Sequence, residues 1–457
     1  MDRAKQLGEG SVGKLLLKFS IPAIIGMLVN ALYTVIDRIF VGQGVGLLGI
    51  SATTIAFPIS IIILGFGLLI GIGSAVSISI KLGQNNRKEA ERILGNAFTL
   101  CIILSIFITV LGLAFQEPLL RIFGASDEVM PLAIQFLTII LSGTVLQLIG
   151  FALNNIMRAE GNPKMSMITM LIGAALNTIL NPIFIFVLHL GIRGSALATV
   201  VSQLITSIWI LAYFIKGKSL LKLKSENLKL IGNIVKPILA IGMSSFLFQV
   251  VSSIITVVFN QSLKTLGGDV AIASMGIITS IAMLIMMPIF GINQGVQPII
   301  GYNYGAKNLD RVKRALKLAA IAATCISTTG FAIIELFPRQ ILSAFSSDNE
   351  QLLNIGAPGM QIFLMMLPIF GMQIVGANYF QAVGKARIAI SLSLSKQVLF
   401  QLPLLLILPN FFKLTGIWAA GPVADVLSFV LVISFLIWEL RNLQQTGDVS
   451  EHLLTES

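Results

Sequence analysis

The sequence predicts an all-α integral membrane protein of twelve transmembrane helices, arranged as two parallel repeats of six. Three observations predict this class. Of the 457 residues, 56% are hydrophobic and 11% are charged, whereas soluble domains carry about 25% charged residues. The mean hydropathy is +0.92. Low-charge segments long enough to cross a bilayer recur along the chain, and the two halves of the sequence resemble each other.

The predicted spans are apolar segments that mostly contain about 20 residues or more, the length that a helix needs to cross the hydrocarbon core. Because that core holds no water, a helix is the economical way to satisfy its backbone N–H and C=O groups. The first span is too long for the apolar region of a signal peptide, so we interpret it as helix 1. In order, the spans are 17–41, 53–80, 94–115, 131–157, 166–189, 195–215, 237–263, 270–300, 318–337, 357–381, 388–410 and 415–440.

The basic residues are distributed unevenly between the two predicted sides of the membrane. The formal net charge is +11, from 31 Lys and Arg against 20 Asp and Glu. With the N-terminus inside, most basic residues fall in cytoplasmic segments, and Lys396 falls within a span. This bias fits the positive-inside rule with both termini cytoplasmic, and it explains the charge without nucleic acid as a partner. The basic residues on the outer side are Arg38, Arg121, Arg193, Lys264, Arg339 and Lys413.

An internal repeat divides the predicted helices six and six. Because six helices return the chain to its starting side, the halves are parallel repeats, an arrangement typical of transporters. We expect an N-terminal lobe at 1–215, a cytoplasmic linker at 216–236, a C-terminal lobe at 237–441 and a cytoplasmic tail at 442–457. A shift of 222 residues superposes Gly83 on Gly305, Asn86 on Asn308, Arg92 on Arg314, Gly194 on Gly416 and Ala198 on Ala420.

Five segments spread along the chain carry a family resemblance. They are "YTVIDRIFVG" (33–42), "MRAEGNPK" (157–164), "LNTILNPIFIF" (176–186), "GSALAT" (194–199) and "GVQPIIGYNYGAKNLDRVKRAL" (295–316). In this order and topology, the chain resembles the multidrug and toxic compound extrusion (MATE) family over essentially its whole length. The resemblance implies a bacterial inner-membrane antiporter with a V-shaped cleft, which expels amphipathic organic cations in exchange for H⁺ or Na⁺.

Polar residues of the N-terminal lobe fall at similar depth in three predicted helices. Asp37 lies roughly 9 Å from the outer end of helix 1, Asn181 roughly 12 Å from that of helix 5, and Thr199 roughly 8 Å into helix 6. Asn177 lies one turn from Asn181 on the same face, and Tyr33 lies one turn from Asp37. Oxygen ligands around one carboxylate suit either Na⁺ or a proton. The alternative for the two amides is hydrogen bonding between helices.

The resemblance also bears on this group of residues. Many relatives have Asp in an N-x-x-x-D-P pattern where this chain has "NTILNP", with Asn181. One carboxylate fewer implies a weaker Na⁺ site, so we expect H⁺ as the coupling ion. An interfacial pair with Arg38 is the alternative role for Asp37. Positions that match the family's cation site are Tyr33, Asp37, Asn177 and Thr199.

The C-terminal lobe contains one acid and one base within its last two spans. Lys396 lies roughly 12 Å from the inner end of helix 11, and Asp425 lies roughly 16 Å from the outer end of helix 12. In a core about 30 Å thick these depths nearly coincide. Because an unpaired charge there is costly, we expect the two to pair. The pair has two possible roles, structural support or a second coupling site.

Flexible and amide side chains concentrate in predicted helices 8 and 10. Methionines are soft and adaptable, which suits a cleft that accepts varied aromatic cations. Packing against protein or lipid, and hydrogen bonding between helices, are the alternatives. The candidates for cleft lining are Met283, Met286, Met287, Gln294, Gln297, Met366, Gln373 and Asn378.

The sequence contains no pattern typical of an enzyme. It has two histidines and two cysteines, and we find no catalytic cluster, Walker sequence or metal-ligand spacing. We therefore expect a monomeric transporter in membrane lipid, without a cofactor or metal. A lipid-linked precursor flippase of the same superfamily is the alternative function. Such proteins typically have a more cationic cleft than this sequence predicts.

Overall fold

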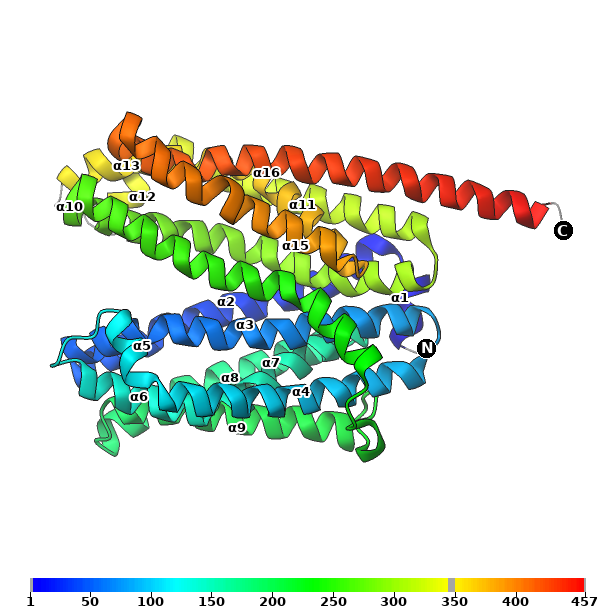
Figure 1. Ribbon diagram of the computed structural model, residues 1–457, viewed down its shortest axis with the longest axis horizontal. Coiled ribbons are helices and arrows are strands. Elements are labelled where there is room, and N and C mark those ends of the chain that lie inside the picture. Colours follow the sequence, from blue (N-terminus) through cyan, green and yellow to red (C-terminus); the bar gives the residue numbers. More distant parts are fainter. Residues whose placement is uncertain (1–2, 344–349, 456–457) are drawn as a thin grey trace. The chain divides into compact units, whose positions relative to one another are not determined.

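The computed structural model describes residues 3–343 and 350–455, and the regular secondary structure of this part is helical (Figure 1). Contacts divide the chain into two compact units. Unit 1 comprises residues up to Glu9 together with Ile25–Val250, and unit 2 comprises Gly10–Ile24 together with the chain from Val251 onward. The first part of helix α2 (Val12–Val45) thus belongs to unit 2, and the first part of helix α10 (Gly232–Gly305) belongs to unit 1.

Unit 1 contains two groups of packed helices. Helices α3, α4 and α7 pack against one another, and α9 packs against α6, α7 and α8 (Figure 1). The π-helix η1 (Ile183–Val187) continues α8, and the 3-10 turn η2 (Ser225–Asn227) follows α9. The α-helices are α1 (Arg3–Glu9), α2 (Val12–Val45), α3 (Leu47–Gly83), α4 (Arg87–Ala114), α5 (Gln116–Ile122), α6 (Met130–Ser142), α7 (Thr144–Ala159), α8 (Pro163–Pro182) and α9 (Ile192–Ile215).

Unit 2 is organised around α14, which packs against α11, α15 and α16. Its apolar core includes Phe259, Met360, Ile417 and Trp418. The helices are α10 (Gly232–Gly305, from Val251 onward in this unit), α11 (Leu309–Leu336), α12 (Pro338–Ser343), α13 (Glu350–Leu364), α14 (Leu367–Ala382), α15 (Ala386–Leu394), the π-helix η3 (Ser395–Gln401) and α16 (Leu402–Thr455).

The number of apolar helices agrees with the predicted twelve spans. Within the described residues, nine helical segments are long and apolar enough to cross a membrane, and two bent helix pairs raise the number to eleven. One of the nine, Ala386–Asn442, contains 57 residues and would extend ~85 Å if straight. Non-helical backbone at Lys413 interrupts it. Dividing this segment at Lys413 gives twelve spans, and the protein is a multi-pass membrane protein.

Two spans that the sequence predicts as single helices are broken. The predicted span 131–157 bends by 51° between α6 and α7, and 357–381 bends by 42° between α13 and α14. At the first break Gly143 lies so close to Val200 that a Cβ would be 2.6 Å from its Cγ2. At the second, Pro368 lacks the N–H that would continue the helix, and its ring crowds the preceding turn. Hydropathy does not register either feature.

Glycines allow helices to cross at backbone contact in both units. A Cβ on Gly242 of α10 would lie 1.8 Å from the Leu69 carbonyl oxygen of α3 in unit 1. A Cβ on Gly295 would lie 2.7 Å from the Ser20 nitrogen of α2 in unit 2. Ser20 and Gly242 are 222 residues apart, so they occupy equivalent positions in the two repeats. The two crossings are therefore equivalent, although the glycine named in unit 2 lies on the opposite helix of the pair. The internal repeat therefore extends to the packing.

We expect Gly242→Ala to lower the free energy of unfolding by about 3 kcal/mol, because the methyl group forces α3 and α10 apart. Thermal melting of the purified protein in detergent measures this effect. Gly276→Ala is the matched control, since no atom lies within 4 Å of a Cβ built there. Equal melting temperatures for the two variants would contradict the proposed crossing.

Side chains of unit 1 hold the segment between α9 and α10 in place. Asn96 of α4 is fully buried, and its amide nitrogen donates to the carbonyl oxygens of Asn227 at 3.3 Å and Lys229 at 3.2 Å. Its carbonyl oxygen accepts from Ile231 N at 2.8 Å. Thr99 Oγ1 donates to Leu228 O at 2.7 Å. The segment is therefore docked on α4 immediately before α10 begins at Gly232.

Candidate functional site

Three helices of unit 1, α2, α8 and α9, place polar side chains around the Asp37 carboxylate. Asp37 Oδ1 accepts hydrogen bonds from Asn181 Nδ2 and from Ser195 Oγ, the latter at 3.2 Å. Asn181 and Ser195 are both 0% exposed, and Asp37 is partly buried. Two neutral donors thus hold one carboxylate oxygen. In the described part of the chain, no hydrogen bond to Oδ2 is present.

A second polar pair lies one helical turn away. Asn177 precedes Asn181 by four residues, so both project from one face of α8. Asn177 Nδ2 donates to Thr199 Oγ1 of α9 at 3.1 Å, and Asn177 is 3% exposed. The structure therefore brings together Asp37, Asn177, Asn181 and Thr199, which the sequence placed at similar depth on three helices.

Asn181 has the most unusual environment of the group. Its Nδ2 donates to Asp37, and its Oδ1 is buried without a hydrogen-bond partner. Pro182 follows and begins a transition to the π-helix η1. Single π-helical turns are rare and occur frequently at functional sites. A buried amide oxygen without a donor carries a desolvation cost and is available as a ligand for a cation.

Tyr33 and Arg38 lie on the same helix as Asp37, with different partners. Tyr33 is one turn before Asp37, and no hydrogen bond joins the two within the described ranges. The Arg38 guanidinium lies 5.4 Å from the ring centroid of Phe57, a cation–π distance. No salt bridge joins Arg38 to Asp37 among the described residues. The interfacial Asp37–Arg38 pair considered as an alternative is therefore not formed.

Ser195 is a member of this group that the sequence pattern did not single out. This residue precedes Thr199 by four positions within "GSALAT", so both lie on one face of α9. The four-residue spacing that relates Asn177 to Asn181 on α8 also relates Ser195 to Thr199, and it therefore predicts Ser195 as a member of the group. Its hydroxyl gives Asp37 a donor from a third helix.

In unit 2, Lys396 and Asp425 lie side by side. Lys396 Nζ is 2.6 Å from Asp425 Oδ1, and the side chains are 21% and 17% exposed. The same ammonium lies 4.9 Å from the Phe370 ring centroid. Lys396 belongs to the π-helix η3, and its partners Asp425 and Phe370 belong to α16 and α14. The ion pair has an aromatic face beside its cation and is shielded from most of the solvent.

The residues predicted to line a cleft differ in their surroundings. Met283 is 54% exposed, whereas Met286 packs against the apolar core of unit 2. Gln373 is 2% exposed, and neither of its amide atoms has a hydrogen-bond partner. Asn378 Nδ2 donates to Ile374 O of its own helix at 3.0 Å. The partly buried members are Met287, Gln294, Gln297 and Met366. A shared role for these residues stays a prediction.

Comparison with known proteins identifies the family. A family model described as MatE matches residues 22–183 and again residues 240–407, once in each half of the chain. The chain belongs to the MATE family. The double match agrees with the internal repeat, and the fold class predicted from the sequence is confirmed for this MATE protein.

Relatives of this MATE protein match over nearly its whole length. The multidrug export protein MepA of Staphylococcus haemolyticus (strain JCSC1435) is 29% identical over 435 residues, 95% of each chain. The MATE multidrug transporter DinF-BH, solved with a bound ligand, is 39% identical, and its structure matches with a TM-score of 0.89 over 95% of this chain and 97% of that one. An outward-facing multidrug resistance MATE transporter of the MOP superfamily is 26% identical, with a TM-score of 0.90 over 96% and 98%.

Proposed function

We propose that this protein is a secondary antiporter that exports amphipathic organic cations, and that protonation of Asp37 couples export to the H⁺ gradient. The observation that carries the proposal is the Asp37 carboxylate within an apolar helix, held through Oδ1 by Asn181 and Ser195. Ionisable groups inside membrane spans mark ion pathways and relays by default. The names of the relatives, multidrug export protein and multidrug transporter, support drugs as the exported class.

The hydrogen-bond pattern leaves one oxygen of the Asp37 carboxylate, Oδ2, able to bind a proton. Oδ1 is occupied by two neutral donors, so a proton would bind at Oδ2 without displacing either of them. Charged Asp37 attracts a cationic substrate, and protonated Asp37 does not. Alternate occupancy by proton and drug therefore gives exchange, because each ligand favours release of the other.

The choice of H⁺ over Na⁺ rests on charge. Holding a dehydrated cation requires several oxygen ligands with sufficient negative charge, and this group contains one carboxylate together with neutral amides and hydroxyls. A proton needs only the carboxylate. One observation favours Na⁺: the Asn181 Oδ1 atom is buried without a hydrogen-bond partner. A transport experiment distinguishes the two coupling ions.

Transport into proteoliposomes with each gradient imposed alone tests the coupling ion. We expect a pH gradient to drive transport of a fluorescent organic cation, and a Na⁺ gradient at equal pH to drive little, because Asp37 is the only carboxylate of the group. Asn181→Asp should increase the response to Na⁺, since it adds a second carboxylate beside Asp37. Transport that follows Na⁺ and ignores the pH gradient in the unmodified protein would refute H⁺ coupling.

A further inference from the structure

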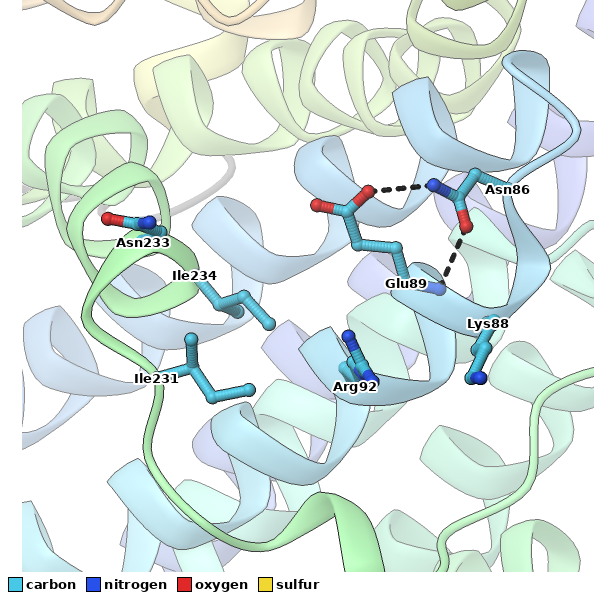
Figure 2. A pocket seen from close by; sticks show the side chains of 7 residues that line it. All are labelled: Asn86, Lys88, Glu89, Arg92, Ile231, Asn233 and Ile234. Atoms are coloured by element: carbon cyan, nitrogen blue, oxygen red, sulfur yellow. Dashed lines mark hydrogen bonds between the residues drawn. The ribbon is translucent and has the colours of Figure 1, made fainter.

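A cationic cavity lies in unit 1 between the turn that joins α3 to α4 and the residues at which α10 begins (Figure 2). Its volume is about 370 Å³, and Lys88, Arg92, Ile231 and Asn233 are among its lining residues. Pockets for small ligands occupy about 300–1,000 Å³. None of these residues belongs to the Asp37 group or to the Lys396–Asp425 pair.

Two cations of this cavity have no acidic partner. Lys88 and Arg92 are exposed, and within the described ranges neither forms an ion pair. The neighbouring cations differ in this respect. Arg87 Nε is 3.5 Å from Glu91, and Lys224 Nζ is 3.2 Å from the same carboxylate. Lys88 and Arg92 are therefore available to an external anion.

The one carboxylate that lines the cavity is already engaged. Glu89 lies 3.0 Å from Lys81 Nζ, and Asn86 Nδ2 donates to it at 2.8 Å. Figure 2 shows this carboxylate turned toward Asn86. Its negative charge is therefore balanced by Lys81, and the unbalanced charge of the cavity is positive.

The internal repeat shows how this part of unit 1 differs from its counterpart in unit 2. In unit 2 the Arg311 guanidinium donates a hydrogen bond to the carbonyl oxygen of Gly10. A shift of 222 residues places Glu89 at the position of Arg311 and Gly232 at that of Gly10. An ionised carboxylate only accepts hydrogen bonds, so Glu89 cannot donate to a backbone carbonyl. Glu89 therefore makes no such bond to the start of α10, where the Asn96 hydrogen bond to Ile231 N is formed instead.

Apolar side chains border the cationic part of the cavity. Ile231, which is 37% exposed, and Ile234, which is buried, are among its lining residues. They lie where α10 begins, and the Asn96 hydrogen bond holds the backbone at Ile231 in place. A soluble phosphate would gain nothing from these side chains, whereas a phospholipid has an anionic phosphate next to an apolar body.

We propose that this cavity binds the headgroup phosphate of an anionic phospholipid, with Arg92 and Lys88 on the phosphate and Ile231 against the acyl end. The planar guanidinium of Arg92 suits two phosphate oxygens at once. Basic pockets between transmembrane helices on the cytoplasmic side take anionic headgroups in this way. The proposal concerns binding and is independent of the transport cycle proposed above.

Native mass spectrometry of the purified protein, titrated with phosphatidylglycerol or phosphatidylcholine in a neutral detergent, tests this site. We expect preferential retention of phosphatidylglycerol. Arg92→Gln should weaken that affinity about 5- to 10-fold, because one phosphate contact is lost, and Lys88→Gln should add to the effect. Arg314→Gln is the matched control, since it removes the same charge at the equivalent position of unit 2 and should leave the affinity unchanged.

Thermal melting without lipid confirms that each variant is folded before its binding is compared. Equal weakening by Arg92→Gln and Arg314→Gln, or undiminished binding by Arg92→Gln, would overturn the site. Titration with inorganic phosphate distinguishes the source of the anion. If phosphate alone stabilises the protein as strongly as phosphatidylglycerol does, and Arg92→Gln removes that effect, the assignment to a lipid is wrong.

Discussion

Asp37→Asn is expected to reduce drug efflux to the level of cells without the transporter, while the protein still inserts and folds. Asn has nearly the shape of Asp, and its amide oxygen can accept the hydrogen bonds from Asn181 and Ser195 that Oδ1 accepts. It cannot take up or release a proton in the relevant pH range, and it carries no charge to attract a cation. Drug resistance and dye efflux in cells stripped of other pumps measure the effect, with membrane yield measured in parallel.

Asp127→Asn is the matched control for this prediction. Its side chain is 90% exposed and lies 3.3 Å from Arg121, outside the apolar spans, so the same chemical change should leave efflux intact. Ser195→Ala removes one donor to Asp37 and should weaken efflux less than Asp37→Asn does. Normal efflux by a well-expressed Asp37→Asn protein would refute the coupling role of this carboxylate.

Lys396→Met is expected to lower the free energy of unfolding by about 3 kcal/mol, because Asp425 is then left as an unpaired charge in a largely buried position. Asp425→Leu added to Lys396→Met should restore most of that loss, since neither charge remains. A thermal-stability cycle of the two single variants and the double variant measures the coupling. Losses that add in the double variant would show that the 2.6 Å contact between Lys396 and Asp425 contributes no stability as a pair.

The same variants distinguish the two possible roles of the pair. If it only supports the fold, the double variant should regain transport together with stability. If proton exchange at Asp425 contributes to coupling, the double variant should be stable and transport poorly. Phe370, whose ring lies 4.9 Å from the ammonium, remains in both variants, so packing against α14 changes little between them.

Most of the fold could be predicted because hydropathy is a local property of the chain. The spans lie where apolar residues run for at least the thickness of the bilayer, and the helices extend a few residues further, as in Val12–Val45 against the predicted 17–41. The bends could not be predicted in this way. At Gly143 the break coincides with close packing against Val200 of another helix, which no local average of hydropathy contains.

The sequence predicts the candidate site from the depth of each polar side chain in the membrane. That depth follows from counting residues along a helix. Asp37, Asn177, Asn181 and Thr199 were placed at similar levels, and they lie close together. Depth alone does not determine which way a side chain faces. Arg38, adjacent to Asp37, faces the Phe57 ring instead of the carboxylate, because successive residues of a helix are rotated by about 100°.

The sequence by itself determined the class of protein, the number of spans, the repeat and the presence of a carboxylate within an apolar helix. Only the tertiary structure decided that Oδ1 of Asp37 is occupied, that Ser195 is one of its donors, and that a cavity lies beside Glu89, whereas Arg311 at the equivalent position bonds to Gly10. The physical reason is separation along the chain. Asn181 and Ser195 lie 144 and 158 residues from Asp37, and contacts over such separations depend on how each helix is rotated and packed against its neighbours.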